Sequence, residues 1–329
     1  MKGRLLPATV FDELLAAQDV PAIIEILLRS DYAEDLSISL SRKSGVEAVE
    51  DALSNNLARN FHKLVRIVVG ELRRPVVCFV ERWDVHNVKT VLRGIHSRAL
   101  PDEMRRALIP AGELDPAALE QLLQQSDMSG FLNLLSTWNL PYARPIARHI
   151  AQYQASGNLW LLEHAIDRDY YERAFRSLGG GDGELILVRK IFALEIDVTN
   201  AMLSLRFAGA PEVREVASML LSHGTVELSV FETASQARNF ADALAAFAGT
   251  WLEAPQTAEV RRPSDLERRL EEVFVRRASS LCSKDPGSIA PLLGYVWRKY
   301  KEFLNLRVVV RSKAFGLPED QMRKELLLG

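Results

Sequence analysis

The sequence is poor in cysteine and in long apolar runs. Its two cysteines, Cys78 and Cys282, both lie in apolar stretches, so we expect buried thiols in a reducing compartment and neither a disulfide framework nor a metal site. No apolar run approaches the roughly 18 residues that a membrane-spanning helix requires, and the first residues lack the apolar region of a signal peptide. We therefore expect a soluble protein of the cytoplasm with no membrane span of its own.

Strong charge of either sign is also missing, and so are the motifs of common active sites. The 41 basic and 43 acidic residues give a formal net charge of -2, which provides no electrostatic reason to expect nucleic acid or an anionic membrane as the main partner. The glycine cluster at 179–183 lacks the lysine and hydroxyl residue that end a phosphate-binding loop. The six histidines show no metal-ligand spacing, and His164 is interpreted as a surface residue. We expect no catalytic site, no metal and no cofactor in this chain.

One stretch of the sequence occurs three times. Each copy has an acid, an asparagine three residues later and an arginine nine residues later. The copies are Asp84, Asn87 and Arg93; Asp197, Asn200 and Arg206; and Glu302, Asn305 and Arg311. The acids are 113 and then 105 residues apart (84, 197, 302), and a step from proline to an acid follows each copy, at 101–102, 211–212 and 318–319. Repetition at this period predicts three similar units in one chain.

The repeated stretch has the pattern of an amphipathic helix. The residues one, four and eight positions after each acid are apolar in all three copies, which is the spacing of one helix face. At about 100° per residue, the acid and the arginine flank opposite edges of that face, so they cannot pair within one straight helix. We expect each of them to contact a different adjacent helix.

The rest of the chain also has helical periodicity. In each unit we expect short helices, a long amphipathic helix, the motif helix and a helix that begins at the proline-acid step. Two segments, 185–188 and 308–310, favour strands by propensity, and we give the helical period precedence there. We predict an all-α fold of three similar helical domains, with residues 1–116, 117–224 and 225–329.

The nine repeated polar residues have two interpretations. Polar side chains beside a buried apolar face commonly bridge helices and fix their packing, and direct contact with a partner is the alternative. We favour the structural interpretation, with the acid as one member of a buried charged pair. Loss of Asp84 would then destabilise the chain, whereas under the alternative it would remove binding.

Essentially the whole sequence resembles a known family, most clearly over residues 80–145 and 291–328. Trp83-Asp84 with Asn87, Leu92 and Arg93 is similar to a pattern in the C subunit of the archaeal and bacterial V/A-type rotary ATPases, a relative of the d subunit of eukaryotic V-ATPases. Further matches are Leu161-Leu162-Glu163, Asp167, Tyr170-Tyr171, Tyr295, Lys301-Glu302, Asn305-Leu306-Arg307, Lys313, Leu317 and residues 322–326. The chain departs from the family pattern at Arg82-Trp83, which replaces Tyr-Phe, and the second copy has no lysine at the position equivalent to Lys89.

The resemblance implies a non-catalytic, all-helical subunit of three similar domains in a pseudo-threefold, funnel-like arrangement. Such a subunit belongs to the central stalk, between the central shaft subunits and the membrane proteolipid ring, and turns with this rotor during ion transport. It would lie on the cytoplasmic face of the membrane through the complex, while ATP chemistry belongs to other subunits. Proton and sodium transport both stay open, as do pumping and ATP synthesis.

Two other function classes also stay open. A generic helical-repeat scaffold that binds other proteins would share the periodicity without the full family pattern. An unrecognised helical enzyme would need a polar pocket that the sequence does not display. Copurification with a shaft subunit and a rotor ring would favour the rotor subunit, and turnover by the isolated chain would favour the enzyme.

Overall fold

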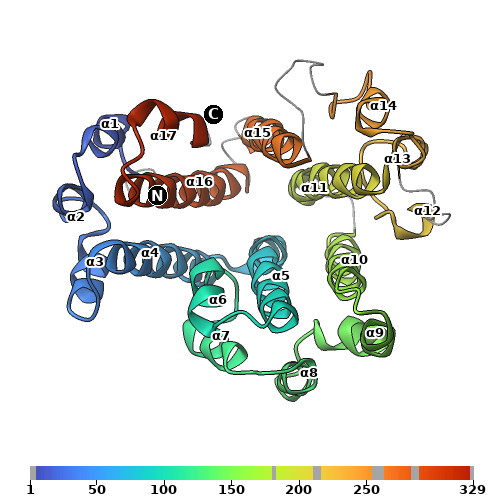
Figure 1. The fold of residues 1–329 in the computed structure, drawn as a ribbon, viewed down its shortest axis with the longest axis horizontal. Coiled ribbons are helices and arrows are strands. Elements are labelled where there is room, and N and C mark those ends of the chain that lie inside the picture. The colour runs from blue at the N-terminus through green and yellow to red at the C-terminus, as the bar shows by residue number, and fades with distance from the viewer. Residues whose placement is uncertain (1–4, 180–182, 210–215, 254–262, 283–288, 327–329) are drawn as a thin grey trace. The chain divides into compact units, whose positions relative to one another are not determined.

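The computed structural model describes residues 5–179, 183–209, 216–253, 263–282 and 289–326. Within these ranges the chain forms seventeen α-helices and one 3₁₀ turn, η2 at Gly70–Leu72, and no strand (Figure 1), so the all-α prediction is confirmed. The two segments that favour strands by propensity lie inside α11 (Gly183–Phe207) and α16 (Ala290–Ala314). The helical period of the apolar residues therefore outweighs local propensity at both places.

The helices fall into two compact units. The first holds residues 1–170 and 295–327, and the second holds residues 171–294 and 328–329, so the boundaries fall within α10 (Trp160–Ser177) and α16. The first unit contains α1 (Ala8–Ala16), α2 (Val20–Leu27), α3 (Ala33–Leu40), α4 (Gly45–Ile67), α5 (Arg73–Ser97), α6 (Pro101–Ala107), α7 (Pro116–Leu123), α8 (Met128–Thr137), α9 (Ala143–Ser156) and α17 (Glu319–Glu325). The second contains α11, α12 (Val216–Met219), α13 (Leu228–Ser235), α14 (Phe240–Ala245) and α15 (Pro263–Cys282).

Several helices begin where the sequence provides a start signal. The carboxylates of Asp19, Asp115 and Asp127 accept backbone N–H bonds at the first turns of α2, α7 and α8. The proline-acid steps at 101–102 and 318–319 begin α6 and α17, where acids occupy the first turn. The third such step, at 211–212, lies outside the described residues.

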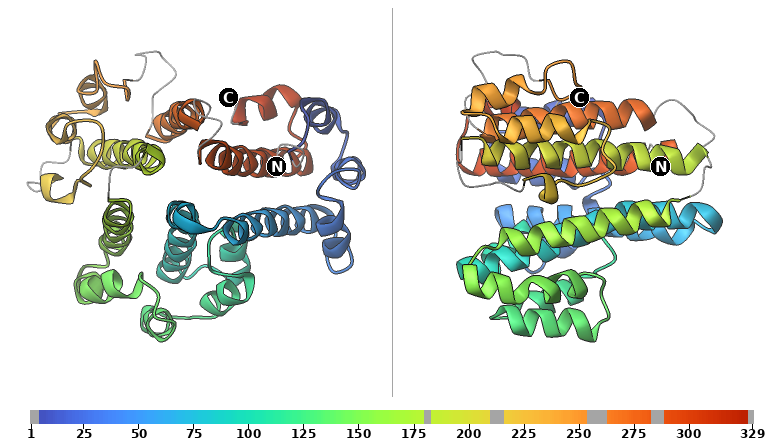
Figure 2. Two further views of the ribbon diagram at one scale, coloured as in Figure 1. Left: turned by 180° about the vertical axis from the view of Figure 1, so that it is seen from behind. Right: turned by 90° about the vertical axis from the view of Figure 1, so that its right-hand side faces the viewer.

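An aromatic cluster forms the core of the first unit where α4, α5 and α16 meet. The Trp83 ring lies 4.9 Å from Phe61 and 5.4 Å from Tyr300, and Phe79 meets Trp297 edge to face at 5.7 Å. Such aromatic pairs contribute about 0.5–1.5 kcal/mol each beyond the burial of their surface. As a result α4 and α16, which are far apart in the sequence, lie side by side (Figures 1 and 2).

The second unit is organised around α11, which packs against α13, α14 and α15 (Figure 2). Val188, Phe192 and Ile196 of this helix are fully buried. Cys282 in α15 and Cys78 in α5 are both buried, as their apolar surroundings predict. None of the described helices combines the length and the apolar character that a bilayer crossing requires.

Candidate functional site

The nine repeated residues lie on three long helices, with the first copy on α5, the second on α11 and the third on α16. Eight of the nine apolar positions beside them are buried, and Val198 is half-buried. All three acids and all three asparagines are buried as well, whereas Arg93, Arg206 and Arg311 are exposed. Buried polar side chains need hydrogen-bond partners inside the protein, so these partners define what the repeated residues do.

In the first copy, Asn87 and Asp84 hold the segment that precedes α7. The Asn87 amide donates from Nδ2 to the carbonyl of Ile109 at 2.8 Å, and its Oδ1 accepts the Ile109 N–H at 2.8 Å. The Asp84 carboxylate accepts the N–H groups of Glu113 and Leu114 at 2.7 and 3.0 Å. Each side chain thus satisfies two backbone groups that have no partner in a helix. We call this arrangement the first clamp.

The second copy repeats these bonds, and we call it the second clamp. Asn200 donates from Nδ2 to the carbonyl of Leu221 at 2.9 Å and accepts the Leu221 N–H at 2.8 Å. Asp197 accepts the N–H groups of Thr225 and Val226 at 2.9 and 3.1 Å. An aspartate and an asparagine three residues apart on one helix therefore again hold a segment, here the one that precedes α13.

A glycine makes room for the acid in both clamps. A Cβ atom at Gly112 would lie closer than 3.0 Å to the Asp84 carboxylate, and one at Gly224 would lie equally close to Oδ1 of Asp197. Any side chain at these positions would push the carboxylate away from its N–H donors. The glycines follow their acids by 28 and 27 residues (84 to 112, 197 to 224). This spacing is present in the sequence and is the signal that could have revealed both clamps.

The acid of the third copy holds a segment near the other end of the sequence. Glu302 accepts the N–H of Leu6 at 2.6 Å, the Tyr32 hydroxyl at 2.7 Å and the Lys299 ammonium at 2.8 Å. Leu6 lies two residues before the first residue of α1. The equivalent residues are Leu114 before α7 and Val226 before α13. Each of the three acids therefore accepts a backbone N–H at the same distance from the start of a helix.

The partners of the acids differ from the expected charged pair. Asp84 and Asp197 accept hydrogen bonds from N–H and O–H groups of loops and of one indole, and no cation is among these partners. In the third copy the pair is present, because fully buried Lys299 contacts Glu302. Burial, followed by the nearby Glu302 carboxylate, raises the pKa of Tyr32 well above its usual value, so its hydroxyl stays a donor.

Two of the acids have perturbed pKa values. Burial raises the pKa of Asp84 to about 7, and the N–H bonds from Glu113 and Leu114 limit the rise. Burial also raises the pKa of Asp197, against hydrogen bonds from the Thr225 hydroxyl and from the Trp251 indole N–H at 2.9 Å. The dipoles of these donors offset only part of the free energy that it costs to remove a carboxylate from water.

Two of the three exposed arginines of the motif contact other long helices. Arg93 pairs with Glu163 of α10, and Arg311 pairs with Glu50 of α4. The acid of the same copy contacts a different segment in both cases, since the two residues lie on opposite edges of the helix. Arg206 of the second copy is exposed.

Further polar contacts join α5 to α10. Lys89 contacts Asp167 at 2.7 Å, and the Tyr170 hydroxyl donates to the carbonyl of Cys78 at 3.0 Å. The interpretation of His164 as a surface residue is wrong, because its ring is half-buried and its Nε2 is fully buried without a hydrogen-bond partner. Burial, followed by the nearby arginine at 168, lowers the pKa of His164 to about 4.

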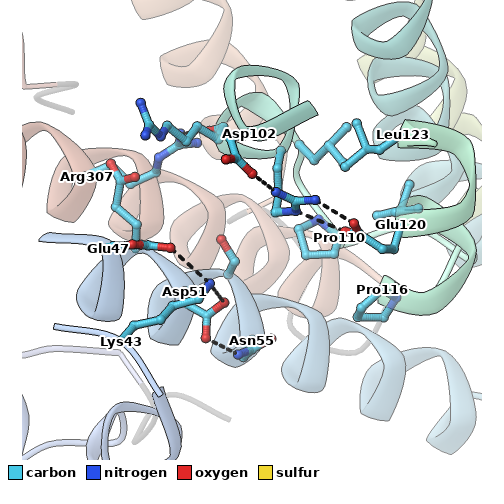
Figure 3. A pocket seen from close by; sticks show the side chains of 16 residues that line it. Lys43, Glu47, Asp51, Asn55, Asp102, Pro110, Pro116, Glu120, Leu123 and Arg307 are labelled. Carbon is cyan, nitrogen blue, oxygen red and sulfur yellow. Dashed lines mark hydrogen bonds and ion pairs between the residues drawn. The ribbon is translucent and has the colours of Figure 1, made fainter. Parts of the chain in front are cut away.

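A cavity of about 440 Å³ lies beside the first clamp, and its walls come mainly from α4, α6 and α7 (Figure 3). Several of its charged groups are paired with one another. Lys43 contacts Asp51 at 2.9 Å, and Arg105 pairs with Asp102 and Glu120. Hydrogen bonds from Arg105 lower the pKa of Glu120. Burial lowers the pKa of Arg307, which also lines this cavity, but a guanidinium stays protonated in proteins, so this shift supplies no base for catalysis.

Metal binding finds no support in the same part of the molecule. Across the described ranges, no three side chains of His, Cys, Asp or Glu lie together in a way that could hold a metal ion. The buried polar residues with a repeated geometry are instead those of the clamps. The chemistry that this arrangement performs is hydrogen bonding to backbone groups at helix starts.

The sequence matches the family described as ATP synthase (C/AC39) subunit over residues 1–325. The C subunit of an A-type ATP synthase from Methanosarcina barkeri is 28% identical over 342 residues, covering 100% of this chain and 90% of the relative. The protein of the same name from Haloquadratum walsbyi is 30% identical over 311 residues, with 93% and 89% covered. The C subunit of a V-type ATP synthase from Deinococcus radiodurans is 26% identical over 330 residues, with 99% and 88% covered. The chain thus belongs to the ATP synthase (C/AC39) subunit family, which comprises the C subunits of V/A-type ATP synthases.

Proposed function

We propose that this chain is a non-catalytic central-stalk subunit of a V/A-type ATPase or ATP synthase. In this role it couples the central shaft subunits to the membrane proteolipid ring and turns with them during ion transport. The family match over residues 1–325 carries the proposal, because relatives that share it over nearly their whole length are named as the C subunit of these machines. The chain would be held at the cytoplasmic face of the membrane through its partners.

The clamps support a coupling role in physical terms. A part that transmits torque must resist deformation between its contact surfaces. Each buried acid ties a long helix to the start of another helix, and breaking such a tie leaves backbone groups without partners, at about 1–3 kcal/mol for each group. We propose that the nine repeated residues stiffen the subunit in this way, and that partner contacts fall to other, exposed side chains.

The three-domain organisation belongs to the same proposal. Residues 1–116, 117–224 and 225–329 would form three similar domains in a pseudo-threefold, funnel-like arrangement. The recurrence of one hydrogen bond at the same position before α1, α7 and α13 supports this view. Three equivalent domains would suit a collar between a shaft and a ring.

Removal of the chain from the purified complex tests the proposed function. ATP hydrolysis by the remaining catalytic part should continue, whereas ATP-driven ion transport into vesicles should be lost and should return when the chain is added back. The shaft subunits should also separate from the proteolipid ring. Transport or attachment that persists without the chain would contradict the proposal.

A second measurement separates the other function classes. The purified chain alone should not hydrolyse ATP, and pull-down from solubilised membranes should recover shaft and ring subunits together. Recovery of unrelated proteins alone would favour a generic scaffold. Turnover that survives removal of contaminants would favour an enzyme.

A further inference from the structure

A second cavity, of about 350 Å³, lies in the second unit beside the second clamp. It is lined by α10, α11 and the segment that the clamp holds. The lining residues are Glu172, Phe175, Arg176, Arg189, Ser222 and His223. This volume is within the range of small-molecule sites, which runs from about 300 to 1,000 Å³.

The second clamp fixes the position of Ser222 and His223. These two residues lie between Leu221, which Asn200 holds, and the Thr225 N–H, which the acid of the same helix accepts. Their backbone is therefore tied on both sides to α11. An exposed serine and an exposed histidine are thus presented to the cavity on a segment with little freedom to move.

The backbone of His223 has an unusual conformation. Its φ angle is +76°, in the left-handed region that residues other than glycine rarely adopt. Such conformations cost on the order of 1–3 kcal/mol and cluster at ligand sites. The His223 ring stacks on Phe175 with centroids 4.5 Å apart and planes at 15°, and Arg189 lies over the same ring at 5.5 Å. Phe175 therefore holds the imidazole and one guanidinium group in fixed places.

The two arginines of this cavity outnumber the acidic side chain among its described lining residues. Arg176 and Arg189 have no ion pair with any described carboxylate, although Glu172 lines the same cavity. The cavity beside the first clamp is different, since its Lys43 and Arg105 are paired. Two unpaired guanidinium groups beside a hydroxyl and an imidazole form a set of donors that suits an anion.

We propose that this cavity binds a phosphate group, either free phosphate or the phosphate of a monoester. Arg176 and Arg189 supply the charge, and Ser222 and His223 supply further hydrogen bonds from the clamped segment. A phosphate has three or more acceptor oxygens and up to two negative charges, which matches donors that come from three separate segments. A carboxylate has only two acceptor oxygens and one charge, so it would satisfy fewer of these donors. The site does not depend on the proposed role in the rotor.

Titration of the full chain tests the site. Inorganic phosphate, glycerol phosphate and acetate are added separately at constant ionic strength, and binding is followed by calorimetry and by the imidazole resonance of His223, assigned with His223→Ala. We expect saturable binding of a phosphate probe and none of acetate in the same range. Arg176→Gln and Arg189→Gln should each weaken phosphate binding at least tenfold.

Lys190→Gln is the matched control, because Lys190 is the exposed neighbour of Arg189 on α11 and does not line the cavity. It removes the same charge and should leave the affinity within twofold of the starting value. Equal losses in Lys190→Gln and Arg189→Gln would assign the binding to diffuse positive charge and overturn the proposal. Absence of saturation with both phosphate probes would also overturn it, as would equally tight binding of acetate. Arg176 is exposed, so Arg176→Gln keeps the test valid if replacement of Arg189 disturbs the packing of Phe175.

The two phosphate probes distinguish the source of the ligand. Equal affinity for inorganic and glycerol phosphate identifies a site for the phosphate group alone. Tighter binding of glycerol phosphate identifies a monoester whose organic part occupies the rest of the cavity. Both results support the proposal, and neither changes with the outcome of the transport assay.

Discussion

The first and second clamps use the same bonds and differ in the residues between those bonds. In both, an asparagine holds one backbone position and an acid holds two positions a few residues further on. Three residues lie between these positions, and the third is the glycine. The first two are Pro110 and Ala111 in the first clamp, and both are buried. In the second clamp they are Ser222 and His223, and both are exposed. The bonds are therefore needed by the fold, whereas the enclosed pair is where the two regions can acquire different roles.

The acids of the two clamps also have different numbers of donors. Asp84 accepts from two backbone N–H groups. Asp197 accepts from two such groups and, in addition, from the Thr225 hydroxyl and the Trp251 indole. Each added donor favours the ionised form of a buried carboxylate. The first clamp is thus the one whose stability should depend more strongly on protonation.

Loss of the asparagines should have the largest effect, and the effect should be larger in the second clamp than in the first. Asn200→Ala leaves both the N–H and the carbonyl of Leu221 without their partner. Asn87→Ala leaves only the N–H of Ile109 without one, because the Ile109 carbonyl also accepts the Ala111 N–H at 2.7 Å. Two buried unsatisfied backbone groups cost about 2–6 kcal/mol. We expect Asn200→Ala to lower the free energy of unfolding of the isolated chain by about 4 kcal/mol and Asn87→Ala to lower it by about 2 kcal/mol, measured by denaturant titration.

An exposed asparagine provides the control for that measurement. Asn133 lies on the exposed face of α8, and Asn133→Ala should change the free energy of unfolding by less than about 0.5 kcal/mol. A loss of less than about 1 kcal/mol in either clamp variant would mean that water replaces the asparagine at little cost. The clamp would then not be a structural tie.

Replacement of the glycines should separate the acid from its donors. Gly112→Ala places a methyl group against the Asp84 carboxylate and should lower the free energy of unfolding by about 3 kcal/mol, because the two N–H groups lose their acceptor. Once the carboxylate is displaced, Asp84→Ala should add little. A double-mutant cycle should therefore show a coupling free energy of about 2 kcal/mol. Additive losses would show that the glycine and the acid act independently.

The sequence identifies which residues form the clamps but not what they hold. The shared period of acid, asparagine and arginine singles out Asp84 and Asn87, because repetition and helical spacing are properties of the chain itself. Their partners are backbone groups of a segment whose only residue shared between the two clamps is the glycine, Gly112 or Gly224. Hydrogen bonds to the backbone leave almost no trace in side-chain identity. The sequence therefore contains no signal that the partners of the acid are backbone N–H groups and not the predicted charged side chain.

The third copy shows the same limit at longer range. Tyr32 and Lys299 surround Glu302 in the fold, yet the tyrosine is 270 residues away in the sequence. No local pattern can indicate such a contact. The helices themselves were predictable because their apolar period is local.

The pH dependence of stability should differ between the first clamp and a variant that lacks its acid. The pKa of Asp84 is about 7 in the folded chain against an ordinary value of 3.8, so the folded state binds the proton more tightly. The stability that this group contributes is present below about pH 4 and is lost as the pH rises towards and through 7. Asp84→Ala should lower the free energy of unfolding by more than about 2 kcal/mol at pH 5, from the loss of two hydrogen-bond acceptors. At pH 8 the loss should be smaller by about 2 kcal/mol.

Denaturant titration of both proteins at several pH values between 5 and 8 measures this difference. Because every other titratable group is common to the two proteins, the change in the difference between them reports on Asp84. The loss in free energy of unfolding caused by Asp197→Ala should also be smaller at high pH than at low pH, since burial raises the pKa of that acid as well. A loss that grows with pH would show that Asp84 is ionised in the fold well below pH 7, and would reverse the assignment.

The smallest expected effect distinguishes the residues that the clamps enclose. His223 has a φ angle of +76°, whereas Ala111, at the equivalent place in the first clamp, has no positive φ angle. His223→Gly relieves left-handed strain of about 1–2 kcal/mol but adds conformational entropy to the unfolded chain and removes the stacking on Phe175. We expect a free energy of unfolding that is unchanged or higher by up to about 1 kcal/mol. Ala111→Gly has no strain to relieve and removes a fully buried methyl group, so it should lower the same quantity by about 1 kcal/mol. An unchanged or raised value in His223→Gly beside a loss in Ala111→Gly would show that His223 is strained in the second clamp. Equal losses in the two variants would show that it is not.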